Sequence, residues 1–324
     1  MPGTYHATNL TTGFSTAVLL CPMLVASLVI SSCATTDLQS EPRILIHGQL
    51  REKSTGESLK VLTLNLAHGR GDGFHQLLQD TETTLENLNE IATLLDRVDP
   101  DVVSLQEADG PSFWSGNFDH VIYLAERGDF GRSVHGAHVD GLGLSYGTAV
   151  LSQLELRQPE AITFSSKDSP VPKGFIVSTI AWPGRNQVEV DVVSVHLDFT
   201  SELVRTKQAT ELIETLKRRN RPRILMGDFN TDWQHEDSSL RYIARELSLR
   251  PYEPDDKNLN TFLKLGARLD WILVSAEMQF LSYHVAPDVV SDHRGVVAEL
   301  VIAPAASNSV QCGERPGSCF LQRD

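Results

Sequence analysis

The most informative stretch of this sequence is Arg223-Ile224-Leu225-Met226-Gly227-Asp228-Phe229-Asn230. Its first half is an apolar run typical of a buried strand, and the glycine that follows lets the backbone turn. Asp228 and Asn230 then present a carboxylate and an amide from that turn, where they can orient a water molecule or bind a phosphate together with a metal ion. Taken alone, the same residues also fit a tight turn in which Asp and Asn only cap the backbone.

The sequence around this stretch alternates short β-branched runs with amphipathic helical segments. Such alternation is typical of an α/β architecture. Most of the unusual polar residues follow the end of a predicted strand, which is where α/β sheets assemble ligand sites on loops. We predict strands at 61–64, 102–105, 188–195, 223–226, 269–274 and 295–302, one helix around 85–95, and a second helix capped by Ser201 and running to about Arg219.

Two predicted strands end in oxygen-bearing side chains. The strand at 61–64 is followed by the amide of Asn65, and the strand at 102–105 is followed by Gln106 and Glu107. Carboxylate and amide oxygens are hard ligands, which favour Mg²⁺, Mn²⁺ or Ca²⁺ over zinc. These strand ends are therefore candidates for a divalent cation site.

Acids and imidazoles also occur close together. Asp292 directly precedes His293, whose reference pKa of about 6.5 suits proton transfer near neutral pH. Asp270 interrupts an apolar run, where a buried carboxylate needs a partner and a histidine is the natural one. His196 ends another predicted strand. The simpler alternatives are a surface turn for Asp292-His293, a solvent-facing strand edge for Asp270 and a core histidine for His196.

In chain order, these residues resemble the motifs of the endonuclease/exonuclease/phosphatase superfamily, the DNase I-like proteins. The resemblance extends over roughly residues 59–302, and a chance match of seven short motifs in the right order is improbable. The matching strings are Thr63-Leu64-Asn65, Leu105-Gln106-Glu107, Gly147-Thr148-Ala149-Val150-Leu151-Ser152, Val195-His196-Leu197, Gly227-Asp228-Phe229-Asn230, Arg268-Leu269-Asp270-Trp271-Ile272 and Ser291-Asp292-His293.

The resemblance implies the fold and the metal site. The expected fold is a four-layer α/β sandwich, in which two mixed β-sheets face each other and helices flank them. The site is expected at one edge of the paired sheets. Glu107 resembles the principal metal ligand of the family, with Asn65 and Asp292 near the same ion.

The catalytic roles are also implied by the resemblance. His293 resembles the family histidine that contacts the scissile phosphate or acts as a base, and Asp270 would hold its ring. Asp228 and Asn230 resemble the pair that orients water and phosphate, and His196 a further donor on the phosphate side. The general base stays open between Asp228 and His293.

Lys173 resembles a position at which relatives carry a basic residue reaching toward phosphate, although a solvated loop lysine is an equal alternative. The expected activity is hydrolysis of a phosphodiester or phosphomonoester by metal-assisted attack of water, with Mg²⁺ as the cofactor and Mn²⁺ or Ca²⁺ as alternatives. A DNA or RNA endonuclease and a non-catalytic binding module on the same fold are the rival hypotheses.

Charge narrows the choice of partners. The formal net charge of −14 opposes binding modes that neutralise many phosphates with Lys and Arg, so stable nucleic-acid binding is not favoured. A lipid, nucleotide or other small phosphoester is the favoured substrate, and we expect a monomer. Relatives differ in substrate through their loops, and the distinctive loops are predicted at 109–118, 128–143 and 235–239, the second containing His135 and His138.

The N-terminal segment contains no Lys, Arg, Asp or Glu in its first 36 residues, and residues 17–30 form an apolar run. That run suits the hydrophobic region of a signal peptide. The following Ile30-Ser31-Ser32-Cys33 resembles the lipobox of bacterial lipoproteins, which would make Cys33 the lipidated residue, although only His6 stands where a basic residue is expected. The alternatives are an ordinary cleaved signal and a buried apolar segment.

These features predict the organisation of the chain. Residues 1–32 would be a signal peptide, 33–58 a lipidated tether, 59–304 the endonuclease/exonuclease/phosphatase domain and 305–324 a tail. Cys312 and Cys319 are closely spaced in that tail and fit a small disulfide loop. The expected location is the bacterial cell envelope, as a membrane-anchored lipoprotein facing the periplasm or the exterior, with secretion as the alternative.

Overall fold

The computed structural model describes residues 42–51, 58–165 and 169–303 of the chain. The chain divides into two compact units, 1–36 and 37–324, and every described residue belongs to the second. The predicted signal peptide, Cys33 and the pair Cys312 and Cys319 lie outside the described residues, so they stay predictions. Among the helices that are described, none is both long and apolar enough to cross a membrane.

The first of two sheets is mixed and has seven strands. Only β2 and β3 run parallel, so both deliver their last residues to the same edge of the sheet. All other neighbours are antiparallel. In spatial order the strands are β1 (Ile44–Ile46), β4 (Arg132–Gly141), β5 (Leu144–Ser152), β3 (Val102–Asp109), β2 (Ser58–Asn65), β13 (Val296–Ile302) and β12 (Met278–Val285).

The second sheet has six strands and is also mixed. Here β8 and β9 form the parallel pair, which again brings two strand ends to one edge. The remaining pairs are antiparallel. In spatial order the strands are β10 (Leu249–Pro251), β11 (Asp270–Ser275), β9 (Arg223–Asp228), β8 (Arg185–His196), β7 (Gly174–Trp182) and β6 (Arg157–Thr163).

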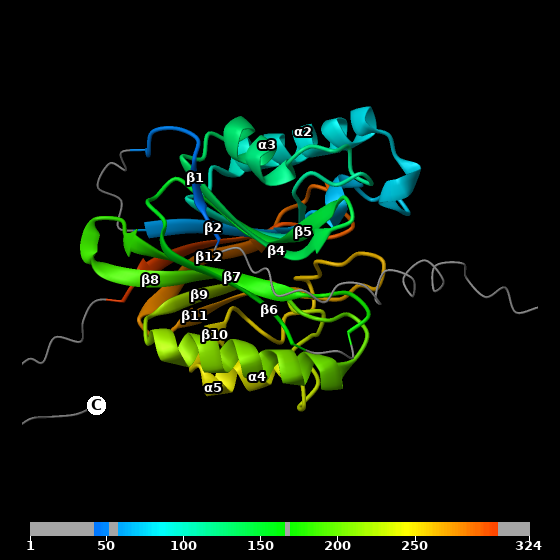
Figure 1. The fold of residues 1–324 in the computed structure, drawn as a ribbon. Helices are drawn as coiled ribbons and strands as arrows, with labels where there is room; N and C mark the ends of the chain where they lie inside the picture. The colour runs from blue at the N-terminus through cyan, green and yellow to red at the C-terminus, as the bar shows by residue number, and fades with distance from the viewer. Residues whose placement is uncertain (1–41, 52–57, 166–168, 304–324) are drawn as a thin grey trace, which may run out of the picture. The chain divides into compact units, whose positions relative to one another are not determined.

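Apolar side chains form three clusters that correspond to the layers. One fills the space between the sheets, one lies between the seven-stranded sheet and α2 and α3, and one lies between the six-stranded sheet and α4 and α5. Figure 1 shows the two pairs of helices on the outer faces of the paired sheets. The predicted four-layer sandwich is therefore confirmed. The helices are α2 (Thr81–Val98), α3 (His120–Arg127), α4 (Glu202–Arg219) and α5 (Ser239–Glu246), with short 3₁₀ turns η1 (Ala67–Gly69) and η2 (Gln76–Leu78).

Local signals explain where the long helices begin and end. Asp80 caps α2 by accepting a hydrogen bond from the backbone N–H of Thr83 at 2.8 Å, and Asp99 ends it in the left-handed conformation. Ser201 occupies the N-cap position of α4 as predicted, but its side chain makes no capping hydrogen bond. The buried carboxylate of Asp198 accepts the backbone N–H of Thr200 and Ser201 instead.

Two segments form more regular structure than the sequence predicts. Ile44–Ile46, assigned above to the tether, forms β1 and pairs with β4, so the folded part begins before Leu59. The predicted loop at 128–143 is wrong for most of its length because β4 occupies it. The glycines there suggested a loop, but Gly136 lies in β4, where β4 comes unusually close to Gly147 of β5. A Cβ added at Gly147 would lie 1.9 Å from the carbonyl oxygen of Gly136.

Candidate active site

Strand register places three of the predicted site residues side by side. Asp228 at the end of β9 pairs with His196 at the end of β8 and with Asp270 at the start of β11. Residues directly opposite each other in a sheet point to the same face. Gly227 allows this arrangement, because it has a φ of +147° and a Cβ there would lie 2.0 Å from the carbonyl oxygen of Val195.

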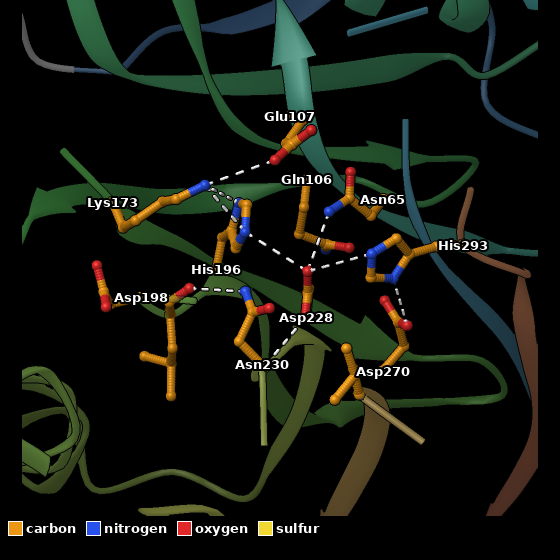
Figure 2. A network of polar contacts seen from close by, with 12 residues as sticks. Asn65, Gln106, Glu107, Lys173, His196, Asp198, Asp228, Asn230, Asp270 and His293 are labelled. Atoms are coloured by element: carbon orange, nitrogen blue, oxygen red, sulfur yellow. Dashed lines mark hydrogen bonds and ion pairs between the residues drawn. The ribbon is translucent and has the colours of Figure 1, made fainter. Parts of the chain in front are cut away.

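His293 completes a chain of three side chains. Its Nδ1 lies 2.7 Å from Oδ2 of Asp270, and its Nε2 lies 3.8 Å from Oδ2 of Asp228 (Figure 2). Phe262 packs against the imidazole with ring centroids 4.8 Å apart. Burial alone would lower the pKa of His293, but the charges of Asp270 and Asp228 outweigh it and raise the pKa to about 10. The ring is thus held in place and kept protonated.

Asp228 has a perturbed carboxyl group. Burial raises its pKa to about 7, with Asp270 adding to that shift and His293 opposing it. Its Oδ2 accepts a hydrogen bond from Nδ2 of Asn65 at 3.0 Å, and this contact crosses from the seven-stranded sheet to the six-stranded sheet. Its Oδ1 accepts the backbone N–H of Asn230 at 2.9 Å. A carboxyl group with a pKa near 7 is suited to proton transfer at neutral pH.

Asn230 also fixes the loop that follows β9. It adopts a left-handed backbone conformation with a φ of +51°, and its Nδ2 donates a hydrogen bond to the carbonyl oxygen of Leu197 at 3.0 Å. The amide nitrogen is therefore engaged by the main chain. The predicted partner of Asp228 is present, with the additional task of holding the loops after β8 and β9 together.

Lys173 and His196 lie on the other side of Asp228. Lys173, immediately before β7, is buried, and its Nζ donates to Nε2 of His196 at 3.0 Å. Burial, followed by the positive charge of Lys173, holds the pKa of His196 well below its usual value. His196 is thus neutral, with Nε2 3.5 Å from Oδ2 of Asp228. Lys173 is therefore not a solvated loop lysine, and its role toward phosphate stays a prediction.

Glu107 is aimed into the site by a β-bulge. The register of β3 against β5 shifts between Gln106 and Ala108, and Glu107 has a φ of +47°. Burial would raise the pKa of Glu107, but the nearby charges of His68, Lys173 and Arg70 hold it well below its ordinary value. The carboxylate is ionised at any physiological pH.

Sequence reasoning missed three residues around Glu107, namely His68, Arg70 and Asp109. His68 Nε2 and Arg70 Nη1 lie 3.5 and 3.6 Å from Oε2 of Glu107, while Lys173 Nζ lies 3.6 Å from Oε1. His68 Nδ1 lies 2.6 Å from Oδ1 of Asp109, which is fully buried. The available signal was a His and an Arg within five residues of Asn65, next to glycines in a short loop after a strand.

The predicted metal ligands converge in part. Asp292 and Glu107 both lie beside the guanidinium group of Arg70, at 2.5 Å and 3.6 Å. Lys264 Nζ lies 3.7 Å from the same oxygen of Asp292. The amide oxygen of Asn65 accepts the backbone N–H of Ala67 at 2.9 Å and has a second lone pair.

This donor set fits a hard divalent cation. Two carboxylates and one amide supply oxygen atoms only. The ionised Glu107 has its nearest cationic nitrogens 3.5 to 3.6 Å away, whereas Asp292 is paired with Arg70 at 2.5 Å and would exchange that partner for the cation. Asp228, Asp270 and His293 also offer ligand atoms within 4.8 Å of one another. In that trio, however, Nδ1 of His293 and Oδ2 of Asp270 are hydrogen-bonded to each other, so these two atoms are already engaged.

A network of buried hydrogen bonds between the two sheets lies next to the site. Gln106 Nε2 donates to Ser194 Oγ at 3.0 Å, and Ser194 Oγ donates to the carbonyl oxygen of Leu105 at 2.8 Å. Gln106 Nε2 also donates to Ser104 Oγ at 2.8 Å. These buried hydrogen bonds join β3 to β8 and so fix the spacing between Glu107 and His196.

Comparison with known proteins places this arrangement in a family. The chain belongs to the Endonuclease/Exonuclease/phosphatase family, whose model matches residues 62–293. Members of this superfamily hydrolyse phosphoester bonds and are usually dependent on a divalent metal. No curated protein matches the sequence.

Solved structures share the fold. An endonuclease/exonuclease/phosphatase from Beutenbergia cavernae has a TM-score of 0.62 at 19% identity, over 76% of this chain and 72% of that one. The mannosyl-6-phosphatase Bt3783 of Bacteroides thetaiotaomicron has a TM-score of 0.57 at 20% identity, over 75% and 100%. The human Nocturnin catalytic domain with bound sulfate has a TM-score of 0.59 at 16% identity, over 81% and 98%. At these identities the likeness concerns the fold.

Proposed function

We propose that this protein is a divalent-metal-dependent phosphoesterase that hydrolyses a phosphodiester or phosphomonoester by attack of water. The observation that supports this most strongly is the chain Asp270–His293–Asp228, held beside the ionised Glu107 and the buried Lys173. It combines proton-transferring groups with positive charge for phosphate oxygens. The positive charge is needed because the anionic oxygens of a phosphate ester repel a nucleophile. The proton-transferring groups are needed because the attacking water loses a proton and the leaving alcohol gains one.

Proton transfer is assigned to Asp228 and His293 as a coupled pair. Asp270 engages Nδ1 of His293, which leaves Nε2 as the nitrogen that faces Asp228 and the reacting groups. One member accepts the proton of the attacking water, and the other donates to a phosphate oxygen or the leaving alcohol. Because the two groups interact strongly, their titration belongs to the pair rather than to either residue.

The remaining residues hold the phosphate and the cofactor. Lys173 donates toward the phosphate. Neutral His196 orients the ammonium group of Lys173 and offers a ring nitrogen to the phosphate side of the site. Glu107 and Asp292, with the amide oxygen of Asn65, would hold Mg²⁺, with Mn²⁺ or Ca²⁺ as alternatives. When bound, the cation would neutralise phosphate charge and polarise the phosphorus. Glu107 and Asp292 provide the fixed negative charge for that task.

Turnover of bis(p-nitrophenyl) phosphate and p-nitrophenyl phosphate tests the proposal. We expect release of p-nitrophenol in the presence of Mg²⁺, loss of activity with chelator, and recovery when Mg²⁺ is restored. His284 is exposed on β12 and provides a matched control, so His284→Ala should behave as the wild type. Activity that persists in chelator, or a folded protein inactive on both esters and on plasmid DNA, would contradict the proposal and favour a binding module.

The cell envelope remains the proposed location. The support is the apolar segment at 17–30 and the lipobox-like string ending at Cys33. Growth with a clickable palmitate analogue should label the wild-type protein, and Cys33→Ser should remove the label. Labelling that persists in Cys33→Ser would show that Cys33 is not the anchor.

A further inference from the structure

Large apolar side chains are exposed on the loops that carry the site. Three are phenylalanines and three are leucines, and they lie on segments far apart in the sequence. We call them the apolar rim, which consists of Phe74, Phe113, Leu142, Phe199, Leu263 and Leu265. Burying such side chains would be favourable, so their exposure near a catalytic centre indicates a surface that meets a partner.

Contacts connect the rim to the site on several sides. Phe113 precedes Trp114, whose Nε1 donates to Asp109 at 2.8 Å, and the backbone N–H of Phe113 donates to the carbonyl oxygen of Gly143, beside Leu142. Asp109 in turn holds His68 next to Glu107. The β4–β5 hairpin and the loop after β3 are therefore joined at the Glu107 side of the site.

Three further members of the rim lie on two other segments. Lys173 Nζ lies 5.9 Å from the ring centroid of Phe199, in the loop after β8. Leu263 and Leu265 flank Lys264, whose Nζ lies 3.7 Å from Asp292. The rim therefore reaches Lys173 on one side and Asp292 on the other.

The charge of these segments differs from that of the whole chain. The chain has a net charge of −14, yet residues 73–79, 110–118, 141–144, 199–200 and 262–267 contain a single charged side chain, Lys264, and the exposed acids Asp72, Asp80 and Asp140 lie just outside them. Lys264 is half-exposed between two exposed leucines. The segment Leu263-Lys264-Leu265 is complementary to a phospholipid surface, because its leucines can contact acyl chains and its ammonium group can pair with a phosphate.

We propose that the apolar rim rests on a phospholipid surface and that the substrate is a phosphoester lipid drawn from that surface into the site. This inference rests on the proposed phosphoesterase function and names its substrate class. In the reaction, the oxygen of water forms the new bond to phosphorus, the bond from phosphorus to the lipid alcohol breaks, and the proton released by water goes to that alcohol.

A nucleic acid fits the rim less well than a lipid does. Stacking on bases requires aromatic rings, which only the three phenylalanines of the rim supply, whereas Leu142, Leu263 and Leu265 present no π face. The net charge of −14 also opposes a polyanion. Exposed aliphatic side chains around a polar site are complementary to a phospholipid bilayer, which has an apolar interior and charged headgroups.

Insertion can be measured without turnover. Leu265→Trp places a fluorophore on the rim, and Leu281→Trp places one on an equally apolar but distant position, exposed on β12. Both full-length variants are mixed with vesicles of brominated phosphatidylcholine in chelator. We expect stronger quenching of Leu265→Trp than of Leu281→Trp. Equal quenching in the two variants would overturn the proposal, because any N-terminal anchor acts on both alike.

Turnover then tests the substrate class. In the double variant Leu142→Asn/Leu265→Gln, hydrolysis of phosphatidylcholine in vesicles should fall about tenfold, while hydrolysis of bis(p-nitrophenyl) phosphate should not change. Leu281→Gln should leave both rates unchanged. If wild-type protein hydrolyses the soluble ester but neither phosphatidylcholine nor sphingomyelin vesicles, the lipid inference fails and the phosphoesterase proposal stands. Rim-dependent nicking of plasmid DNA would likewise overturn it in favour of a nucleic-acid substrate.

Discussion

Two histidines in this protein have nearly the same surroundings. In Asp270–His293–Asp228 and in Asp109–His68–Glu107, Nδ1 lies 2.6 to 2.7 Å from a fully buried aspartate, and Nε2 lies 3.5 to 3.8 Å from a second carboxylate. Each buried aspartate raises the pKa of its imidazole against the opposing effect of burial. We call these the His293 chain and the His68 chain.

The chains differ at their outer carboxylates. Asp228, in the His293 chain, has its pKa raised to about 7 by burial and by Asp270, so it can exchange a proton near neutral pH. Glu107, in the His68 chain, is held ionised by the cations around it, although burial opposes this. In the proposed mechanism the same arrangement therefore serves proton transfer in one case and maintenance of a fixed negative charge in the other.

Removal of His293 should have the largest effect. His293→Ala takes away the group that shares a proton with Asp228, so kcat for bis(p-nitrophenyl) phosphate should fall by about 10² to 10⁴-fold. The loss should persist at saturating Mg²⁺, because the substitution leaves Glu107 intact. Steady-state kinetics of a variant with wild-type circular dichroism checks this, and near-normal turnover would remove His293 from the proposed mechanism.

The sequence revealed the His293 chain because its residues lie in short strings at strand ends. The run before Gly227 predicts β9, and the structure adds the parallel pairing with β8 that places Asp228 beside His196. Six of the strands and the two long helices follow from the same patterns of apolar residues, whereas the two facing sheets were expected from the family resemblance.

The His68 chain could not be predicted in this way. His68 belongs to a 3₁₀ turn with a φ of +56°, and Glu107 is aimed by a bulge, so neither orientation follows from a regular period of two. The partner of His68 is Asp109, the last residue of β3, and the alternation of apolar residues does not single it out as a site residue. The edge strand β1 was missed for a related reason, since only three residues form it and its pairing is with a distant strand.

A third histidine tests what the aspartate partner contributes. His138 is buried between hydroxyls, with Thr148 Oγ1 at 2.9 Å from Nε2 and Thr163 Oγ1 at 3.2 Å from Nδ1. Burial, with smaller contributions from His135 and Lys173, lowers its pKa to about 3. Carboxylate partners thus raise the pKa of a buried imidazole, whereas hydroxyl partners leave it lowered.

Stability against pH should report this difference. Below pH 6.5 the unfolded chain protonates His138 while the folded chain does not until about pH 3, so stability is lost as pH falls through that window. Urea unfolding of wild type and His138→Gln at pH 7 and pH 5 should show the wild type losing about 2 kcal/mol more than the variant. Parallel pH dependence of the two proteins would contradict the lowered pKa.

Removal of His68 should have a smaller effect than removal of His293 and one of a different kind. His68→Ala takes away a cation beside Glu107, so the concentration of Mg²⁺ giving half-maximal activity should change by about tenfold. We expect a decrease, because the positive charge of His68 no longer competes with Mg²⁺ for Glu107. kcat at saturating Mg²⁺ should be largely retained, which separates this variant from His293→Ala.

A loss of kcat in His68→Ala that Mg²⁺ does not restore would mean that the two chains act alike. Asp109→Asn provides a second reading, because it keeps the size of the side chain while removing its charge. It should shift the Mg²⁺ requirement in the same direction as His68→Ala. Opposite shifts would show that Asp109 acts on the site by another route.

Trp114→Phe should give the smallest effect. The indole Nε1 is one of two donors to Oδ2 of Asp109, and Ser115 Oγ at 2.5 Å is the other, so the substitution removes one hydrogen bond and leaves the carboxylate with a donor. The phenyl ring keeps much of the packing against His68, whose ring centroid lies 5.0 Å away. Since such a hydrogen bond contributes about 0.5–1.5 kcal/mol, unfolding should become easier by about that amount and the Mg²⁺ requirement should move less than in His68→Ala. A larger shift than in His68→Ala would show that Trp114, and not the imidazole, sets the position of Glu107.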